Sequence, residues 1–293
     1  MRRRNWAIGC ALAGFSALWA QAPAWAHQPV MDMAPRWQGG YGFQVRHESY
    51  GSDKLMSGTS EVGNPFNLDK ELDTTWLEGI YTFRRELRLS VKVPYVDQQR
   101  TVLQNGAPVT LSGSGLGDVV VGMLFKRYKN QASATGNIAL TTSIRLPTGD
   151  SSGDYPVGDG STDFGLSFSK SMERANFYQY YDLFYWENRE GDRGIHRGNE
   201  LGLDVNLGWH PYHKNLTNTG VFVMMDFSLR NEERGRDLKG VTGGKRVSGG
   251  PVLVYYRQGM MIRAEYKYPF HEDVYNTQLS RGPEFNVGIG FVF

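Results

Sequence analysis

Apolar and polar residues alternate with a period of two along most of the chain. In the first such segment, apolar or small residues occupy every second position and polar residues lie between them; the former are Trp37, Gly39, Tyr41, Phe43 and Val45. The same alternation returns over residues 87–95, 119–126, 138–146, 164–169, 201–209, 221–229 and 262–268. A period of two gives a strand one apolar and one polar face. The pattern predicts an all-β chain.

The lengths of the connections indicate how the strands are joined. Less regular strands are expected near residues 72–83, 176–186 and 245–257, and a last strand over residues 284–293. Short connections alternate with long polar ones, which are residues 51–70, 97–114, 148–160, 187–197, 231–244 and 271–282. Short periplasmic turns and long outer loops are typical of outer-membrane barrels. We predict a transmembrane antiparallel up-and-down β-barrel of about twelve strands over residues 36–293.

The final ten residues carry the most specific single signal. Every second residue is apolar, and the chain ends on an aromatic residue; these positions are Phe285, Val287, Ile289, Phe291 and Phe293. This ending resembles the C-terminal insertion signal of outer-membrane proteins, which implies outer-membrane lipid and the barrel-insertion machinery as partners. A soluble β-sandwich would share such wide apolar faces, so it stays open as the alternative fold.

The N-terminus has the features of an export signal. Arginines occupy residues 2–4, a mostly apolar stretch follows to residue 20, and Ala24 and Ala26 form a small-x-small cleavage pattern. We predict a signal peptide over residues 1–26 and a flexible mature N-terminus over residues 27–35, with an uncleaved signal anchor as the alternative. The single cysteine, Cys10, lies in that signal, so the mature chain is expected to have no disulfide.

Charge and hydropathy narrow the class further. The formal net charge is +2, and removal of the three signal arginines brings the chain close to neutrality without any basic block. This argues against a nucleic-acid partner. No apolar run outside the signal approaches the length of a membrane helix. The mean hydropathy of −0.46 does not exclude a barrel, because lipid-facing and lumen-facing residues average out.

Charged residues recur on the polar faces of the predicted strands. We expect these residues to line the lumen: Arg46, Glu78, Arg88, Lys92, Asp118, Lys126, Arg145, Asp163, Asp204, Arg263, Glu265 and Lys267. Their mixed signs argue against a strongly ion-selective pore. In a narrow barrel such residues can also pair across the interior and seal it. A conducting channel and a non-conducting structural or ligand-binding barrel therefore both stay open.

Residues 176–186 form a strand with aromatic residues on both faces. If Asp182 points inward, four aromatic residues share its face: Tyr178, Tyr180, Phe184 and Trp186. Such a patch can stack against a flat apolar solute, so we consider these residues candidate ligand contacts. A β-bulge in this strand, or membership of the aromatic girdle, explains the same sequence.

Three short motifs combine a tight bend with an acidic residue. They are Gly115-Leu-Gly-Asp118, Leu146-Pro-Thr-Gly-Asp150 and Gly160-Ser-Thr-Asp163. Their glycines and Pro147 suit the points where strands meet loops, and the first motif lacks the lysine and the helix of a nucleotide-binding loop. Together with the strand order, they resemble the outer-membrane transporter family of the MetA pathway of phenol degradation over roughly residues 37–293. The resemblance implies a porin-like barrel for uptake of small, often aromatic, solutes, with no catalytic residue and no cofactor.

A lipid hydrolase is the enzyme alternative for an outer-membrane barrel. His47 and Ser49 fall on the lipid-facing side of the first strand and form the nearest candidate pair. Hydrolysis would also need a polar residue that orients the histidine. The other signatures of an outer-membrane phospholipase are absent, so we expect a protein that is not an enzyme.

Two segments contain residue types that bind metals. The carboxylates of Asp150, Asp154, Asp159 and Asp163 suit Ca²⁺, although their spacing matches no EF-hand loop. His27, Met31 and Met33 combine an imidazole with thioethers, which suit copper. Solvated acids and a flexible leader are the simpler interpretations, so we predict no metal site while leaving both open.

Overall fold

A computed structural model describes residues 37–131, 134–153, 155–194, 196–214, 218–235 and 243–293. The predicted signal peptide and the predicted flexible N-terminus lie outside these residues, as do His27, Met31, Met33 and Asp154. No helix within these ranges is long and apolar enough to cross a membrane.

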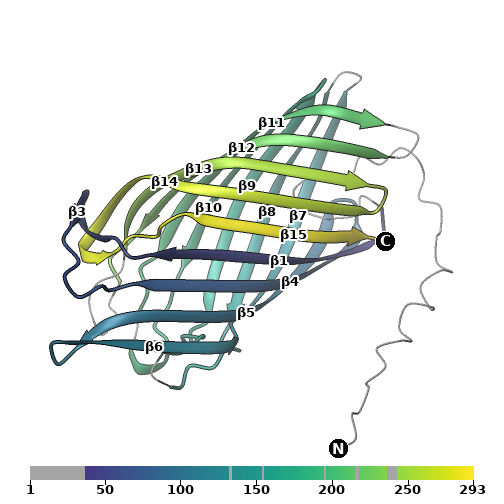
Figure 1. Cartoon of the computed structure of the whole chain (residues 1–293). Coiled ribbons are helices and arrows are strands. Elements are labelled where there is room, and N and C mark those ends of the chain that lie inside the picture. The colour runs from purple at the N-terminus through teal and green to yellow at the C-terminus, as the bar shows by residue number, and fades with distance from the viewer. Residues whose placement is uncertain (1–36, 132–133, 154, 195, 215–217, 236–242) are drawn as a thin grey trace, which may run out of the picture.

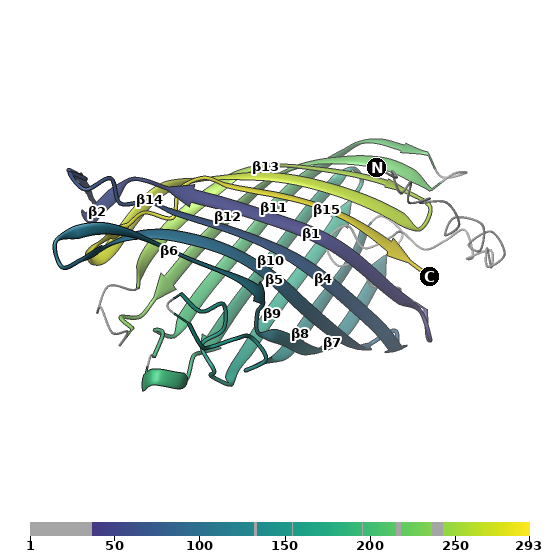
Figure 2. The same cartoon turned by 60° about the horizontal axis from the view of Figure 1, so that its bottom comes forward.

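Twelve antiparallel strands form one closed wall (Figure 1, Figure 2). In order around the barrel they are β1 (Tyr41–Ser52), β4 (Lys70–Arg84), β5 (Leu87–Gln104), β7 (Val119–Gln131), β8 (Ala134–Leu146), β9 (Asp163–Arg174), β10 (Phe177–Glu187), β11 (Glu200–Lys214), β12 (Thr219–Glu232), β13 (Gly244–Arg257), β14 (Met260–Leu279) and β15 (Glu284–Val292). β1 pairs with both β4 and β15, which closes the ring. Closure leaves these strands no free edge, which a sheet in lipid requires.

The outward face of the barrel is apolar. Exposed apolar side chains include Leu77, Phe125, Leu166, Leu207 and Leu253, which occupy alternate positions of their strands. A band of this kind faces lipid, because backbone polar groups are satisfied within the wall and only apolar side chains meet the hydrocarbon. The alternation read from the sequence therefore separates the lipid face from the lumen face.

The C-terminal residue takes part in closing the ring. The backbone N–H of Phe293 donates to the carbonyl of Tyr41 at 2.8 Å, and the Tyr41 N–H donates to the Phe293 carbonyl at 3.0 Å. The Tyr41 and Phe293 rings stack with centroids 5.3 Å apart, and Phe43 lies 5.9 Å from Phe293. Chain end and first strand thus form one aromatic seam on the outward face.

The strands continue beyond the apolar band at the end of the barrel away from the C-terminus. Two segments predicted as loops are mostly strand: β5 runs on to Gln104 and pairs with β6 (Ala107–Leu116), and β14 runs on to Leu279. In the loop predicted over residues 51–70, β2 (Leu55–Gly58) and β3 (Ser60–Val62) form a hairpin beside β14. The polar composition marks where the chain leaves lipid, not where the strands end.

The beginning of the first strand also differs from the prediction. Trp37 and Gly39 precede β1 instead of extending its lipid face, and Gly39 has a φ of +77°, a left-handed conformation that turns the chain. Trp37 packs against a buried apolar cluster of β10–β15, made of Tyr178, Phe222, Met224, Val252, Val254, Tyr256, Met261 and Val292. These side chains fill the lumen side of the wall near the ends that carry the termini.

Candidate functional site in the barrel lumen

Two adjoining cavities occupy the interior. The outer cavity, of about 630 Å³, reaches Arg246, Arg281 and Glu284 near the long-loop end. The inner cavity, of about 400 Å³, reaches Arg88 and Glu173 near the short turns. The cavities share lining residues on β4, β5, β10 and other strands, so together they follow most of the length of the barrel.

Most of the charged residues predicted for the lumen line these cavities. They are Arg46, Glu78, Arg88, Lys92, Lys126, Arg145, Asp204, Arg263, Glu265 and Lys267. Asp118 and Asp163 line neither cavity. Both instead hold loop segments at the outer end of the wall, because their carboxylates accept hydrogen bonds from loop backbone.

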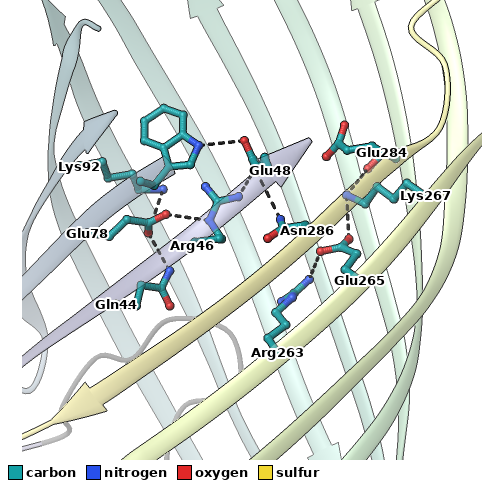
Figure 3. A network of polar contacts seen from close by, with 12 residues as sticks. Gln44, Arg46, Glu48, Glu78, Lys92, Arg263, Glu265, Lys267, Glu284 and Asn286 are labelled. Carbon is teal, nitrogen blue, oxygen red and sulfur yellow. Dashed lines mark hydrogen bonds and ion pairs between the residues drawn. The ribbon is translucent and has the colours of Figure 1, made fainter. Parts of the chain in front are cut away.

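The charges on β1, β4 and β5 form one network across neighbouring strands (Figure 3). Arg46 Nε donates to Glu78 Oε1 at 2.9 Å, and the Arg46 guanidinium also pairs with Glu48. Lys92 Nζ lies 3.8 Å from Glu78 Oε2, and Gln44 donates to the same oxygen at 2.9 Å. Each carboxylate therefore has a cation, which offsets the cost of holding charge inside the wall.

A second network spans three strands, β12 to β14, and is separated from β1 by β15 (Figure 3). Lys267 on β14 lies 2.8 Å from Asp226 Oδ1 on β12 and 3.1 Å from Glu265 Oε1. The intervening β13 has Gly250 opposite Asp226, so no side chain blocks the lysine. Arg263 completes the group by donating to Glu265 Oε2 at 2.9 Å. The Asp226 and Glu265 side chains are almost wholly buried, at 3% and 4% exposed.

Strand β10 turns four of its aromatic residues to the lumen. Its pairing with β9 and β11 runs without a register shift through Asp182, and this residue and the four candidate ligand contacts all line the inner cavity. No bulge therefore reverses the strand. The Trp186 ring lies over Gly165 on β9, and the Phe184 ring lies over Gly202 on β11. A β-carbon at either glycine would collide with the ring.

Two arginines cover the upper half of this aromatic row. The Arg145 guanidinium lies 4.6 Å from the Trp186 ring, and that of Arg230 lies 4.6 Å from the Phe184 ring. Cation–π contact of this kind holds both groups flat against the wall. Tyr178 belongs to the apolar cluster, and Tyr180 packs partly against it. The lumen thus has guanidinium groups at the level of Trp186 and phenol rings nearer the short turns.

Hydroxyl groups face the aromatic row from β5, β8 and β9. The hydroxyl side chains that line the inner cavity here are Ser90, Thr141, Ser143, Ser167, Ser169 and Ser171. Ser167 donates to Asp182 at 2.8 Å and thereby links this wall to β10. Hydroxyls both donate and accept hydrogen bonds. A ring-bearing solute with a hydroxyl group can therefore meet rings on β10 and hydrogen-bonding partners on β9 beside it and on β5 and β8 farther along the wall.

The three motifs noted in the sequence meet at the outer end of β7–β9. Asp118 Oδ1 accepts the Gly149 N–H at 2.9 Å, and its other oxygen accepts the Asp159 N–H at 3.4 Å. Asp163, wholly buried, accepts from Arg145 and Ser161 at 2.8 Å each. The two aspartates pin the ends of the segment between β8 and β9 to the wall.

Asp159, which lies outside the membrane-spanning part, also helps to hold the segment between β8 and β9 against the wall. Burial acts to raise the pKa of its carboxyl, but Arg197, 3.2 Å away, and hydrogen bonds from Ser161 outweigh burial and hold the pKa below its ordinary value. A carboxyl with a lowered pKa stabilises the fold above its unfolded pKa and loses that contribution as pH falls. The attachment therefore weakens in acid.

Replacing Asp118 by Ala should release this segment. The substitution removes two hydrogen bonds to a carboxylate, so we expect proteolysis within residues 148–160 to become about tenfold faster. Limited proteolysis of refolded protein, read by mass spectrometry, measures it. Asp97→Ala is the control, because Asp97 is exposed on the outward side of β5. Equal cleavage of wild type and Asp118→Ala would contradict this account.

The candidate catalytic residues, His47 and Ser49, have other neighbours. His47 Nδ1 lies 3.1 Å from Thr75 Oγ1, and His47 Nε2 lies 3.7 Å from Asp73 Oδ1. Within the described ranges no hydrogen bond links His47 to Ser49, so the ring is directed toward β4 and not toward the serine.

The candidate metal ligands that the structure describes have other partners. Asp150 accepts from Ser152, Asp159 pairs with Arg197, and Asp163 pairs with Arg145. Among the residues that the structure describes, no group of three or more His, Asp and Glu is placed to hold a metal ion.

The predicted set of lumen residues leaves out several that lie there. Asp226, Arg230, Arg246 and Arg281 line the outer cavity, and Glu48 bridges Arg46 and Trp76. The alternation along β1 and β12 already places Glu48 and Asp226 on the polar face, and the same parity places Arg230 inward. Arg281 follows β14 in a connection without alternation, so no sequence signal marked it.

A closed wall with an apolar outer face, an aromatic seam and a polar, charge-paired interior defines an outer-membrane β-barrel. The barrel belongs to the family described as "Putative MetA-pathway of phenol degradation", whose sequence profile matches residues 58–282. No curated protein matches the chain.

Solved structures extend the comparison. The COG4313 outer membrane channel from Pseudomonas putida F1 is 12% identical, over 87% of this chain and 96% of that chain, with a TM-score of 0.65. The NanC porin is 14% identical over 85% and 98%, with a TM-score of 0.45. The β-domain of the Bordetella autotransporter BrkA is 10% identical over 87% and 100%, with a TM-score of 0.44. The first of these likenesses shows that the twelve-strand fold is shared.

Proposed function

We propose that the protein is a channel of the bacterial outer membrane that passes small aromatic and hydrophobic molecules, and that it has no catalytic activity. The observation that carries the proposal is the pair of adjoining cavities that share lining residues along the lumen, with rings on β10 and hydroxyls on β5, β8 and β9. Pockets that combine apolar surface with a few polar groups suit small organic ligands.

The chemistry of the lumen favours a hydroxylated ring over a long alkyl chain. Tyr178 and Tyr180 offer ring faces, and the serines and threonine of β5, β8 and β9 offer hydrogen bonds. Phenol has both features, and the family description refers to phenol degradation. We therefore choose phenol as the test solute.

Removing the rings should slow aromatic uptake while the barrel still inserts. In Tyr180→Ala combined with Trp186→Ala, we expect phenol influx into protein-containing liposomes to fall about thirtyfold, since the two stacking contacts contribute roughly 1 kcal/mol each. Uptake of a small polar solute such as glycerol should fall less. Loss of the Trp186 ring also frees Arg145, so the two single variants separate the ring contact from the arginine position.

The controls use rings on the lipid face of the same strands. Tyr185→Ala on β10 and Trp209→Ala on β11 remove exposed outward aromatics, and they should leave phenol influx unchanged. A heat-dependent gel shift checks folding of every variant. Phenol influx equal to wild type in the Tyr180→Ala, Trp186→Ala protein would remove the aromatic part of the proposal.

Two other functions make different predictions. A sealed barrel predicts no current steps in planar bilayers at any salt concentration and no solute uptake. A lipid hydrolase predicts release of fatty acid by refolded wild type that is lost in His47→Ala. The direction of the His47 ring toward Thr75 and Asp73 gives the hydrolase no support.

A further inference from the structure

Four cations gather at the outer mouth without an equal set of partners. The outer cation cluster consists of Lys70 on β4, Arg100 on β5, Arg246 on β13 and Arg281 between β14 and β15. Lys70 and Arg100 are direct cross-strand neighbours, and like charges in this position destabilise a sheet. Arg246 and Arg281 line the outer cavity. Repulsion between these like charges destabilises the fold unless a bound negative charge offsets it.

Tyr50 on β1 holds two of these cations. Its ring lies between the Arg281 guanidinium, at 3.8 Å, and the Lys70 ammonium, at 5.8 Å. Beyond this ring, Lys70 donates to the backbone carbonyl of Leu279 at 3.3 Å. Both contacts fix the position of Lys70 without neutralising its charge.

Carboxylates approach the cluster unevenly. Glu284 accepts from Arg281 at 3.1 Å, and Glu272 accepts the Arg281 backbone N–H at 2.9 Å. Glu232 faces Arg246 and Arg281 from β12, and Glu48 is already paired with Arg46. Within the described residues, no ion pair involves Lys70, Arg100 or Arg246, and Arg100 Nε is a buried donor without an acceptor.

The energetics of Lys70 agree with this geometry. It lies outside the lipid band, because Asp73 and Glu71 on the outward side of β4 mark where the apolar face ends. Burial, together with repulsion from Arg281, Arg100 and Arg246, lowers the pKa of the Lys70 ammonium to about 7. An added negative charge would reverse that repulsion.

We propose that the outer cation cluster binds the carboxylate of small organic acids at the mouth of the barrel. Guanidinium groups match a carboxylate geometrically, and a partly buried cationic mouth concentrates anions. Arg246 and Arg281 meet the ligand from the cavity, while Lys70 and Arg100 contribute charge from the adjoining strands. Any effect on transport rests on the proposed channel function; binding itself does not.

Calorimetric titration of the refolded full chain in a neutral detergent tests the site. Benzoate is the probe, and benzyl alcohol is the matched ligand with a ring but no charge. In Arg100→Gln combined with Arg246→Gln, we expect benzoate affinity to fall at least about tenfold, the effect of losing one charged hydrogen bond, and benzyl alcohol binding to stay the same. Arg127→Gln with Arg257→Gln, both exposed on the outward side, is the control.

A second variant keeps the test decisive if the double variant folds poorly. Lys70→Gln removes a repulsive neighbour of Arg100, so it should unfold at higher urea than wild type yet bind benzoate more weakly. A purely structural lysine would not change stability and affinity in opposite directions. Unchanged benzoate affinity in folded Lys70→Gln and in folded Arg100→Gln, Arg246→Gln would overturn the proposal, whether or not the barrel conducts.

The pH dependence gives an independent signature. Above pH 7 the free protein loses the Lys70 proton, so carboxylate binding must take it up again, and benzoate affinity should fall between about pH 6 and about pH 8. The charged and titratable groups that face Lys70 are the three arginines, Glu272 and Tyr50. Lys70→Gln should bind benzoate equally at both pH values. A slope that persists in this variant would contradict the assignment.

Discussion

Replacing Lys267 by Met should lower the free energy of unfolding by about 3–5 kcal/mol, the usual effect of removing one partner from a buried ion pair. The lysine lies within 3.1 Å of both Asp226 and Glu265, and these carboxylates have little access to water. Without the ammonium, two negative charges remain side by side in the wall, and Arg263 donates to Glu265. We expect an earlier unfolding midpoint and not a loss of insertion.

Urea unfolding of vesicle-inserted protein, read by the heat-dependent gel shift, measures the change. Lys170→Met is the matched control, because Lys170 is exposed on the outward side of β9 and its replacement should not lower stability. Adding Asp226→Asn to Lys267→Met removes the carboxylate that has lost its cation, while Glu265 keeps Arg263, and should restore most of the loss. A Lys267→Met protein as stable as wild type would show that the network is not buried as the structure has it.

Replacing Gly202 by Val should narrow the passage between the two cavities. A β-carbon at this position would lie 2.2 Å from Cζ of Phe184, so the ring must leave the wall and move into the lumen. Arg230, which covers the ring, is displaced with it. We expect single-channel conductance to fall by roughly half or more, because a pore conducts through its narrowest section.

Single-channel recording in planar bilayers provides the measurement. Gly79→Val on β4 is the control, since a β-carbon there meets no atom within 4 Å. Gly202→Val combined with Phe184→Ala makes room for the new side chain and should recover conductance. If Gly202→Val conducts like wild type, the level of Phe184 does not limit the passage.

The sequence predicted the strands that cross the membrane better than it predicted their ends. Alternation identifies a strand only while one face meets lipid. Beyond the membrane, residues 97–101 of β5 are polar on both faces and the alternation in β6 is brief, so this part of the chain looks like a loop. Backbone pairing nevertheless continues there, for example between Thr101 and Thr110. Trp37 was misplaced for the opposite reason, because an apolar residue in phase with a strand can also pack inside the barrel.

The parity of the strands also indicates which charges face inward but not which of them meet. Asp204 and Arg230 pair because β11 and β12 are neighbours in a register that the sequence does not contain. Lys267 reaches Asp226 across β13 only because Gly250 lies between them. The outer cation cluster combines residues that are more than two hundred positions apart in the chain, so only closure of the barrel reveals it.

The apolar cluster of β10–β15 determines what shape of solute can cross. It fills one side of the lumen near the short turns, where the inner cavity is lined by β1, β4, β5 and β7–β11; farther out, the outer cavity is also lined by β12–β15. If the barrel passes solutes as proposed, we expect the path to be displaced toward β12–β15 as it widens. A compact ring should then pass more readily than a stiff, elongated molecule of the same width, so that length would matter as well as cross-section.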